Sequence, residues 1–148
     1  MKRRCITSPL GPLTLTEENG AITTLRWETG PTEDSPLLKK AEDQLAAYFA
    51  GSLRDFTLPL QVKVSQFQQE VCSAISAIPY GETRSYGHLA QLLNAPPQAV
   101  GQGCGGNPIP ILIPCHRVTG SNRLGGFSGG TGTETKVWLL RHEGGLLL

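Results

Sequence analysis

The stretch Ile109-Pro110-Ile111-Leu112-Ile113-Pro114-Cys115-His116-Arg117-Val118 decides how the second half of the chain is interpreted. Its apolar run predicts a buried extended segment, and Pro114 prevents this segment from continuing as a helix or a central strand. Cys115 therefore comes where buried backbone meets a turn. A cysteine beside a base such as His116 can be held as a thiolate, the nucleophilic form of this side chain. The alternative is a core cysteine with an incidental neighbour, because adjacent residues of an extended chain face opposite ways.

Composition describes an ordinary globular protein. The chain has 148 residues, 39% of them hydrophobic, and a formal net charge of +1, which fits one medium domain or two small ones. Near-neutral charge argues against nucleic-acid binding by bulk electrostatics alone, but it is compatible with a local basic patch. We find no secretory leader and no apolar segment long enough for a bilayer. We therefore expect a cytoplasmic protein without a membrane partner, with four reduced cysteines and no zinc site in its first half.

The first sixty residues predict a small sheet followed by a helix. Asn19-Gly20 is a strong two-residue hairpin signal within an antiparallel meander over residues 5–27. Ser35 and Pro36 predict a capped helix that continues until Gly51. The alternation after the hairpin predicts one shared face, made of Ala21, Thr23, Leu25 and Trp27. Residues 56–62 predict a further short extended piece.

The character of the chain changes from strands to helices near residues 60–64. Ser65 opens a predicted capping box, and the apolar stripe behind it ends at Pro79. Ser85 caps a second predicted helix that ends at Asn94, and Pro97 opens a third, short one. Two short helices joined by a tight turn resemble a helix-turn-helix motif, whose second helix normally meets DNA. On spacing alone, an ordinary helical pair that packs a core remains the alternative.

A glycine-rich loop over residues 120–132 follows the cysteine segment. Such a loop can present backbone N–H groups to a ligand or act as a lid, and it lacks the Gly-Lys-Ser/Thr of a phosphate loop. Thr131 and Glu134 predict a capping box for a last helix, which packs through Val137, Trp138 and Leu140.

Several motifs together resemble one family. Asn107-Pro108 precedes the cysteine segment, and Gly126-Phe127-Ser128-Gly129-Gly130 and Trp138-Leu139-Leu140-x-His142-Glu143-Gly144 follow it. From about residue 67 to 145 the chain closely resembles the methylated-DNA protein-cysteine methyltransferases, also called O6-alkylguanine-DNA alkyltransferases. The resemblance implies an α/β plus α fold. An N-terminal ribonuclease H-like sheet with a helix would occupy residues 1–60, and a C-terminal winged helix-turn-helix domain with the reactive thiol would occupy residues 61–148.

The resemblance also implies a single-turnover DNA repair reaction that needs no cofactor. Cys115 would accept the alkyl group from O6 of guanine, His116 would take the thiol proton through a water, and Glu143 would orient the imidazole. Asn107 would tie the turn after the recognition helix to the active-site segment. Tyr86 would donate to the guanine ring. The implied substrate-binding residues are Val118, whose carbonyl together with that of Cys115 accepts from the exocyclic amine, and Phe127, Ser128 and Gly129.

DNA containing O6-alkylguanine, double-stranded or single-stranded, is the implied partner of a protein expected to be a monomer. Whether several copies bind cooperatively along DNA is left open. The implied DNA-binding residues are Gln98, Ala99, Gly103 and Arg84. For Arg84, a side chain that only faces solvent is as good an interpretation as a phosphate contact.

The chain departs from the family pattern at several positions. Gln98 replaces a usual arginine that enters the minor groove, so weaker extrusion of the base from duplex DNA is expected. Phe127 replaces a frequent tyrosine, so the pocket wall should persist without its hydroxyl. Gly103 and Gly105 replace the usual alanine and basic side chains.

Three other functions fit parts of the sequence. An alkyltransferase-like damage sensor would bind flipped alkylguanine with little or no transfer, but such relatives generally lack the cysteine. A cysteine hydrolase would turn over many times, and the adjacency of Cys115 and His116 disfavours it. A transcriptional helix-turn-helix protein would leave Glu143 and the Cys-His-Arg-Val segment unexplained.

Overall fold

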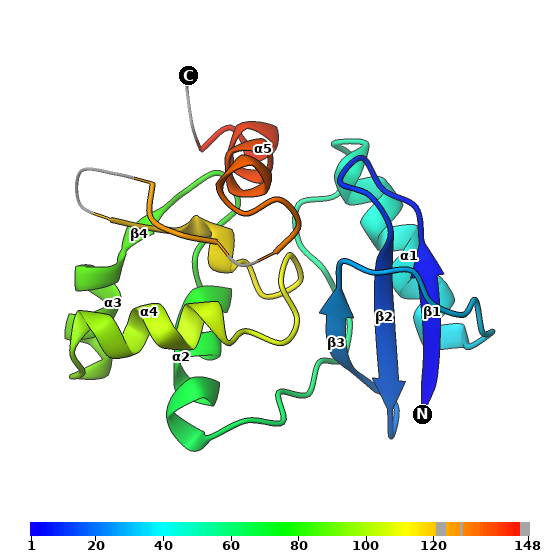
Figure 1. Ribbon diagram of the computed structural model, residues 1–148, viewed down its shortest axis with the longest axis horizontal. Coiled ribbons are helices and arrows are strands. Elements are labelled where there is room, and N and C mark those ends of the chain that lie inside the picture. Colours follow the sequence, from blue (N-terminus) through cyan, green and yellow to red (C-terminus); the bar gives the residue numbers. More distant parts are fainter. Residues whose placement is uncertain (121–123, 128, 146–148) are drawn as a thin grey trace. The chain divides into compact units, whose positions relative to one another are not determined.

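The computed structural model describes residues 1–120, 124–127 and 129–145. The chain divides into two compact units, Met1–Lys63 and Val64–Leu148. Figure 1 labels the elements of the first unit and all but η1 (Cys115–Arg117) and β5 (Val118–Thr119) of the second. None of the helices in the described ranges combines the length and the apolar character that a membrane crossing requires.

The first unit contains a three-stranded antiparallel sheet in the order β1 (Lys2–Ile6), β2 (Leu13–Glu18) and β3 (Ala21–Arg26). Asn19 and Gly20 join β2 to β3 with φ values of 51° and 78°. Two positive φ values at a two-residue connection match the turn that follows the right-handed twist of a hairpin. This confirms the predicted hairpin and meander. Backbone bonds also pair the segment at Leu60 with Ile22 of β3.

The predicted shared face of β3 is confirmed for Thr23 and Leu25, which are both buried, but it is wrong for Ala21. The register shifts between Thr16 and Glu17, which pair with Thr24 and Ile22, so Thr23 is an extra residue opposite them. This β-bulge reverses the alternation, and Ile22 is buried while Ala21 is only half-buried. Hydrophobic alternation cannot reveal such an insertion, because the bulge depends on how two strands pair.

Helix α1 (Pro36–Phe49) forms as predicted. The backbone N–H of Leu38 donates to Oγ of Ser35 at 3.2 Å, and Pro36 occupies the first helical position. Leu38, Ala41, Leu45 and Tyr48 are fully buried at helical spacing. The helix therefore covers the apolar face of the small sheet through a single stripe of side chains.

The second unit is mainly helical (Figure 1). Its elements are α2 (Gln66–Ser76), β4 (Arg84–Ser85), α3 (Tyr86–Leu93), α4 (Pro97–Gly105), a 3-10 helix η1 (Cys115–Arg117), β5 (Val118–Thr119) and α5 (Thr133–Glu143). Strands β4 and β5 form a short parallel pair, and α4 packs against α2 and α3. The α3–α4 pair is the predicted helix-turn-helix, and Asn94 ends α3 with a left-handed φ of 51°.

Gly103 is a packing position on α4. A Cβ atom there would lie 3.0 Å from both γ carbons of Val71 on α2. Ser65 caps α2 by accepting from the backbone N–H of Gln68. The side-chain amide of Gln68 donates to the Gly103 carbonyl at 3.3 Å. The missing side chain therefore allows α4 and α2 to approach closely.

Residue 109 and residues 111–114 are buried as predicted, but the predicted extended segment is wrong. The N–H of Ile113 donates to the carbonyl of Ile109 at 2.9 Å, and Ile111 has a φ of 72°, so the chain turns back on itself. Asn107 stabilises this turn, since its side chain accepts from Ile109 N–H at 3.0 Å and donates to the Ile113 carbonyl at 2.8 Å. Side-chain hydrogen bonds here replace the ladder of a sheet.

The predicted capping box of α5 is also wrong. Gly132, with a φ of 72°, precedes the helix without a side-chain cap, and the N–H of Thr131 donates to Oγ1 of Thr135 at 2.9 Å. The buried face of α5 consists of Thr135, Lys136, Leu139, Leu140 and Glu143, whereas Val137 and Trp138 are half-buried. The face that points inward thus carries two ionisable side chains that hydrophobicity alone could not place.

Candidate active site

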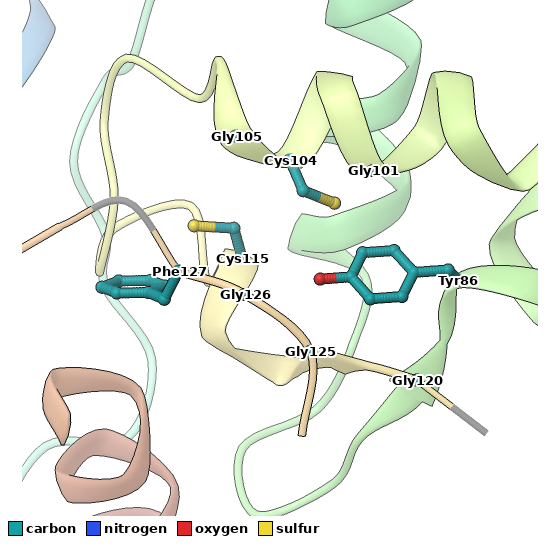
Figure 2. Close-up of a pocket in the computed structure, with 9 residues that line it drawn as sticks. All are labelled: Tyr86, Gly101, Cys104, Gly105, Cys115, Gly120, Gly125, Gly126 and Phe127. Carbon is teal, nitrogen blue, oxygen red and sulfur yellow. The ribbon is translucent and has the colours of Figure 1, made fainter. Parts of the chain in front are cut away.

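Cys115 begins η1 and borders a cavity of about 730 Å³, a size typical of small-ligand sites. The residue as a whole is only 7% exposed. Figure 2 shows the Tyr86 hydroxyl directed into this cavity and the Phe127 ring beside Cys115. The described lining residues are Tyr86, Gly101, Cys104, Gly105, Cys115, Gly120, Gly125, Gly126 and Phe127. Five glycines in this set let a flat ligand approach backbone closely.

Behind the cysteine lies a buried network of charged groups. His116 is 0% exposed, and its Nε2 lies 2.8 Å from Oε2 of Glu143, the last residue of α5. Arg117 donates to the same carboxylate twice, from Nε at 2.8 Å and from Nη2 at 3.0 Å. Its Nη1 donates to the carbonyl of Ile78 at 2.7 Å. The carboxylate is therefore fixed by three hydrogen bonds and presents one oxygen to the imidazole.

This arrangement selects a neutral imidazole that can act as a base. Burial lowers the pKa of His116, and the hydrogen bond and charge of Glu143 oppose this shift. A carboxylate accepts, so Nε2 carries the proton and Nδ1 keeps its lone pair. Within the described part of the chain, Nδ1 has no hydrogen-bond partner. It is therefore available to receive a proton.

The thiol of Cys115 is protonated at rest. Burial raises its pKa, while a hydrogen bond from the Asn107 side chain and the charge of Lys136 lower it. A thiol with this balance needs a base at the moment of reaction. Asn107 thus both shapes the buried turn and contacts the sulfur.

Sequence reasoning gave no site role to Lys136 or Arg117, nor to Cys104, which lines the cavity. The Nζ of Lys136 donates to the carbonyls of Val118 at 2.6 Å and Gly126 at 3.0 Å. The spacing of Lys136 with Leu139, Leu140 and Glu143 was the available signal, because residues three and four apart share a helix face. For Arg117 the signal was its position beside His116, which brings both side chains to Glu143 in a 3-10 turn.

The predicted DNA-binding residues fall in different environments. Gln98 is exposed at the start of α4 and Ala99 is half-buried beside it. Gly103 instead lies buried against α2 and offers no surface to a duplex. Arg84 donates to Glu82 at 3.0 Å and to the Thr83 carbonyl at 2.9 Å, so its guanidinium is already paired locally.

Of the predicted substrate-binding residues, Phe127 lines the cavity, whereas Val118 is fully buried and its carbonyl accepts from Lys136. Ser128 lies outside the described residues. The carbonyl of Gly129 accepts from Gly132 N–H at 2.8 Å, and Gly129 is not among the described residues that line the cavity.

Comparison with known proteins decides the family. The model of the 6-O-methylguanine DNA methyltransferase DNA-binding domain matches residues 66–145, and that of the ribonuclease-like domain of the same enzymes matches residues 1–62. The chain belongs to the 6-O-methylguanine DNA methyltransferase family. This confirms the resemblance found in the cysteine segment and the predicted fold class.

Relatives in the 6-O-methylguanine DNA methyltransferase family cover most of the chain. A methylated-DNA–protein-cysteine methyltransferase from Mycobacterium tuberculosis is 46% identical over 138 residues, 86% of this chain and 84% of the relative. A constitutive one from Bacillus subtilis is 41% identical over 151 residues, 92% and 91% of the two chains. The crystal structure of Mycobacterium tuberculosis OGT in complex with DNA has a TM-score of 0.87 and 45% identity, and covers 96% of this chain and 92% of that one.

Proposed function

We propose that this protein repairs DNA by transferring the alkyl group of O6-alkylguanine to Cys115. The observation that carries the proposal is the placement of this thiol at a cavity wall, one residue before a buried imidazole held by a carboxylate. The names of the relatives, and the DNA complex of one of them, support it. The cavity offers room for one base and a short alkyl chain.

The reaction is a displacement at the alkyl carbon. The Cys115 thiol gives its proton to Nδ1 of His116 through a bridging water, and the sulfur attacks the carbon bonded to O6. The S–C bond forms, the C–O6 bond breaks, and its electron pair remains on the guanine. Glu143 stabilises the imidazolium that results. Donation from the Tyr86 hydroxyl to the guanine ring stabilises charge that develops only in the transition state.

The product explains why each chain would act once. A thioether at Cys115 is not reversed by ordinary attack of water, so the acceptor is consumed. The DNA retains an unmodified guanine, and the protein retains the alkyl group. Free enzyme and lesion should therefore react with a stoichiometry of one to one.

Access to O6 requires the nucleotide to leave the stack, which costs a few kcal/mol and least for poorly paired bases. The α3–α4 pair would hold the DNA, with Gln98 exposed at the start of α4. The uncharged amide of Gln98 offsets the free-energy cost of extruding the nucleotide less well than a cation would. Both duplex and single-stranded alkylated DNA are therefore proposed substrates of a monomer.

A cytoplasmic location completes the proposal. Cys5, Cys72, Cys104 and Cys115 are all free thiols. Unpaired cysteines, one of them the acceptor itself, suit a reducing compartment.

The test is intact mass after incubation with O6-benzylguanine or an alkylated oligonucleotide. We expect a gain of one alkyl group, located on Cys115 by peptide mapping, and no gain in Cys115→Ser. Tight binding of alkylated DNA with unchanged mass would instead support a damage sensor. Repeated turnover without a modified protein would support a hydrolase, and either result would overturn the proposal.

A further inference from the structure

Lys136 lies on α5 with its side chain fully buried, although lysine is among the residue types least often found inside proteins. Burial lowers the pKa of this ammonium to about 8, so it is still mainly protonated at neutral pH. A buried cation is costly unless hydrogen bonds compensate it. Here the carbonyls of Val118 and Gly126 do so, at 2.6 Å and 3.0 Å.

The two carbonyls belong to different segments of the chain: Gly126 lines the cavity itself, whereas Val118 is buried between Cys115 and Gly120, which both line it. Val118 opens β5, three residues after the acceptor cysteine, and Gly126 lies in the glycine-rich loop. The loop also packs against Tyr86, since a Cβ on Gly125 would lie 2.9 Å from Cε2 of that ring and 3.3 Å from Nζ of Lys136. The Nζ atom lies 5.8 Å from the centre of the Tyr86 ring. Lys136 is therefore a common neighbour of β5, the glycine-rich loop and Tyr86.

We propose that Lys136 is a positioning residue that clamps the loop Gly125–Phe127 to β5 and thereby fixes the width of the cavity that receives the damaged base. Its Nζ donates to two backbone carbonyls, so it acts through Val118 and Gly126. The proposal rests on the proposed function, in which this cavity holds the base.

A second effect follows from the charge of the clamp. The ammonium lowers the pKa of the Cys115 thiol against the opposing effect of burial. The same charge also acts on Cys104 and His116, and it faces the Tyr86 ring. Removing the charge of Lys136 should make the Cys115 thiolate harder to form. Because this charge also acts on other groups, thiolate formation must be measured at Cys115 alone.

The test compares three variants with the parent. Lys136→Met keeps an unbranched side chain of similar length and good helix propensity but has neither donors nor charge. Lys136→Gln keeps N–H donors without charge. Lys39→Met makes the same change on the exposed face of α1 and serves as the control.

Three measurements separate the clamp from a merely structural role. Hydrogen exchange reports the protection of peptides that span residues 124–127. Single-turnover transfer from O6-benzylguanine reports the rate. The pH midpoint of iodoacetamide labelling, read from the peptide that contains Cys115, reports the thiolate. Thermal unfolding of every variant reports whether the fold is intact.

For Lys136→Met we expect a parental melting temperature, faster exchange in the loop, transfer slowed about tenfold to a hundredfold, and a labelling midpoint at higher pH. Lys136→Gln should retain part of the loop protection while its midpoint still shifts. Lys39→Met should match the parent in every measurement.

Parental exchange and a parental transfer rate in Lys136→Met would overturn the proposal. A lower melting temperature with uniformly faster exchange throughout Val64–Leu148 would overturn it too, because it would mark Lys136 as a general packing residue. If the parent itself transfers no alkyl group, the proposed function fails, whereas the exchange in residues 124–127 still decides whether the clamp exists.

Discussion

Replacing Glu143 by Gln should reduce both stability and the rate of alkyl transfer. The carboxylate is buried and binds His116 once and Arg117 twice, at 2.8 to 3.0 Å. The amide keeps the shape but leaves the Arg117 guanidinium buried without its counter-charge. Breaking a buried ion pair from one side costs about 3–5 kcal/mol. That is a large part of the 5–15 kcal/mol that typically stabilises a domain.

The chemical effect of Glu143→Gln should exceed the effect on folding. The amide NH2 of glutamine can donate to Nε2 of His116, which would move the imidazole proton to Nδ1 and block the base. Because general-base catalysis contributes about 10²–10⁴-fold, we expect a rate loss in that range under conditions where the variant is folded.

The assay pairs urea unfolding with single-turnover transfer from O6-benzylguanine, measured well below the unfolding transition. Glu134→Gln is the matched control, since Glu134 is exposed on the same helix. The double variant Glu143→Gln with Arg117→Met removes both charges and should recover stability without recovering the rate. If Glu143→Gln unfolds at the urea concentration of the parent and transfers at the parental rate, the network has no such role and the reasoning is refuted.

Three further predictions address packing, pH and DNA. Gly103→Ala should cost about 1–3 kcal/mol in urea unfolding because its Cβ meets both γ carbons of Val71 at 3.0 Å, whereas Gly101→Ala on the same helix has open space and should not destabilise. Because the pKa of His116 is lowered, the folded state binds fewer protons than the unfolded state. The contribution of His116 to the free energy of unfolding should therefore fall as the pH drops from 7 towards 5, by at most about 1.4 kcal/mol per pH unit. This pH dependence should vanish in His116→Asn. Gln98→Arg should tighten duplex binding and steepen the salt dependence by about one counterion, measured by fluorescence anisotropy, and equal salt slopes would contradict the suggested groove contact.

Local signals in the sequence predicted the elements well where one residue decides the local conformation. Asn19 and Gly20 fix the hairpin turn through their own φ values, and Ser35 and Ser85 cap helices by accepting an N–H three residues later. The cysteine segment also predicted the chemistry of the site, because its thiol, imidazole and guanidinium are adjacent in the sequence.

The errors arise where the conformation depends on contacts that a local pattern does not show, some between strands and some within a turn. The bulge at Thr23 is defined by its pairing with β2, and the turn at Ile111 is stabilised by a side chain four residues earlier in the chain. Lys136 resembles any surface lysine until α5 is packed against β5 and the glycine-rich loop. Helical spacing can place Lys136 on one face with Leu139 and Leu140, but it does not show which carbonyls the ammonium reaches.

Asn107 has a consequence for any attempt to re-engineer this protein. It follows Gly106, the C-cap of α4, and its one amide fixes the buried turn and hydrogen-bonds the sulfur of Cys115. If α4 contacts DNA as proposed, a substitution that moves this helix will also displace the nucleophile. Variants selected for altered DNA binding should therefore be screened for thiol reactivity as well.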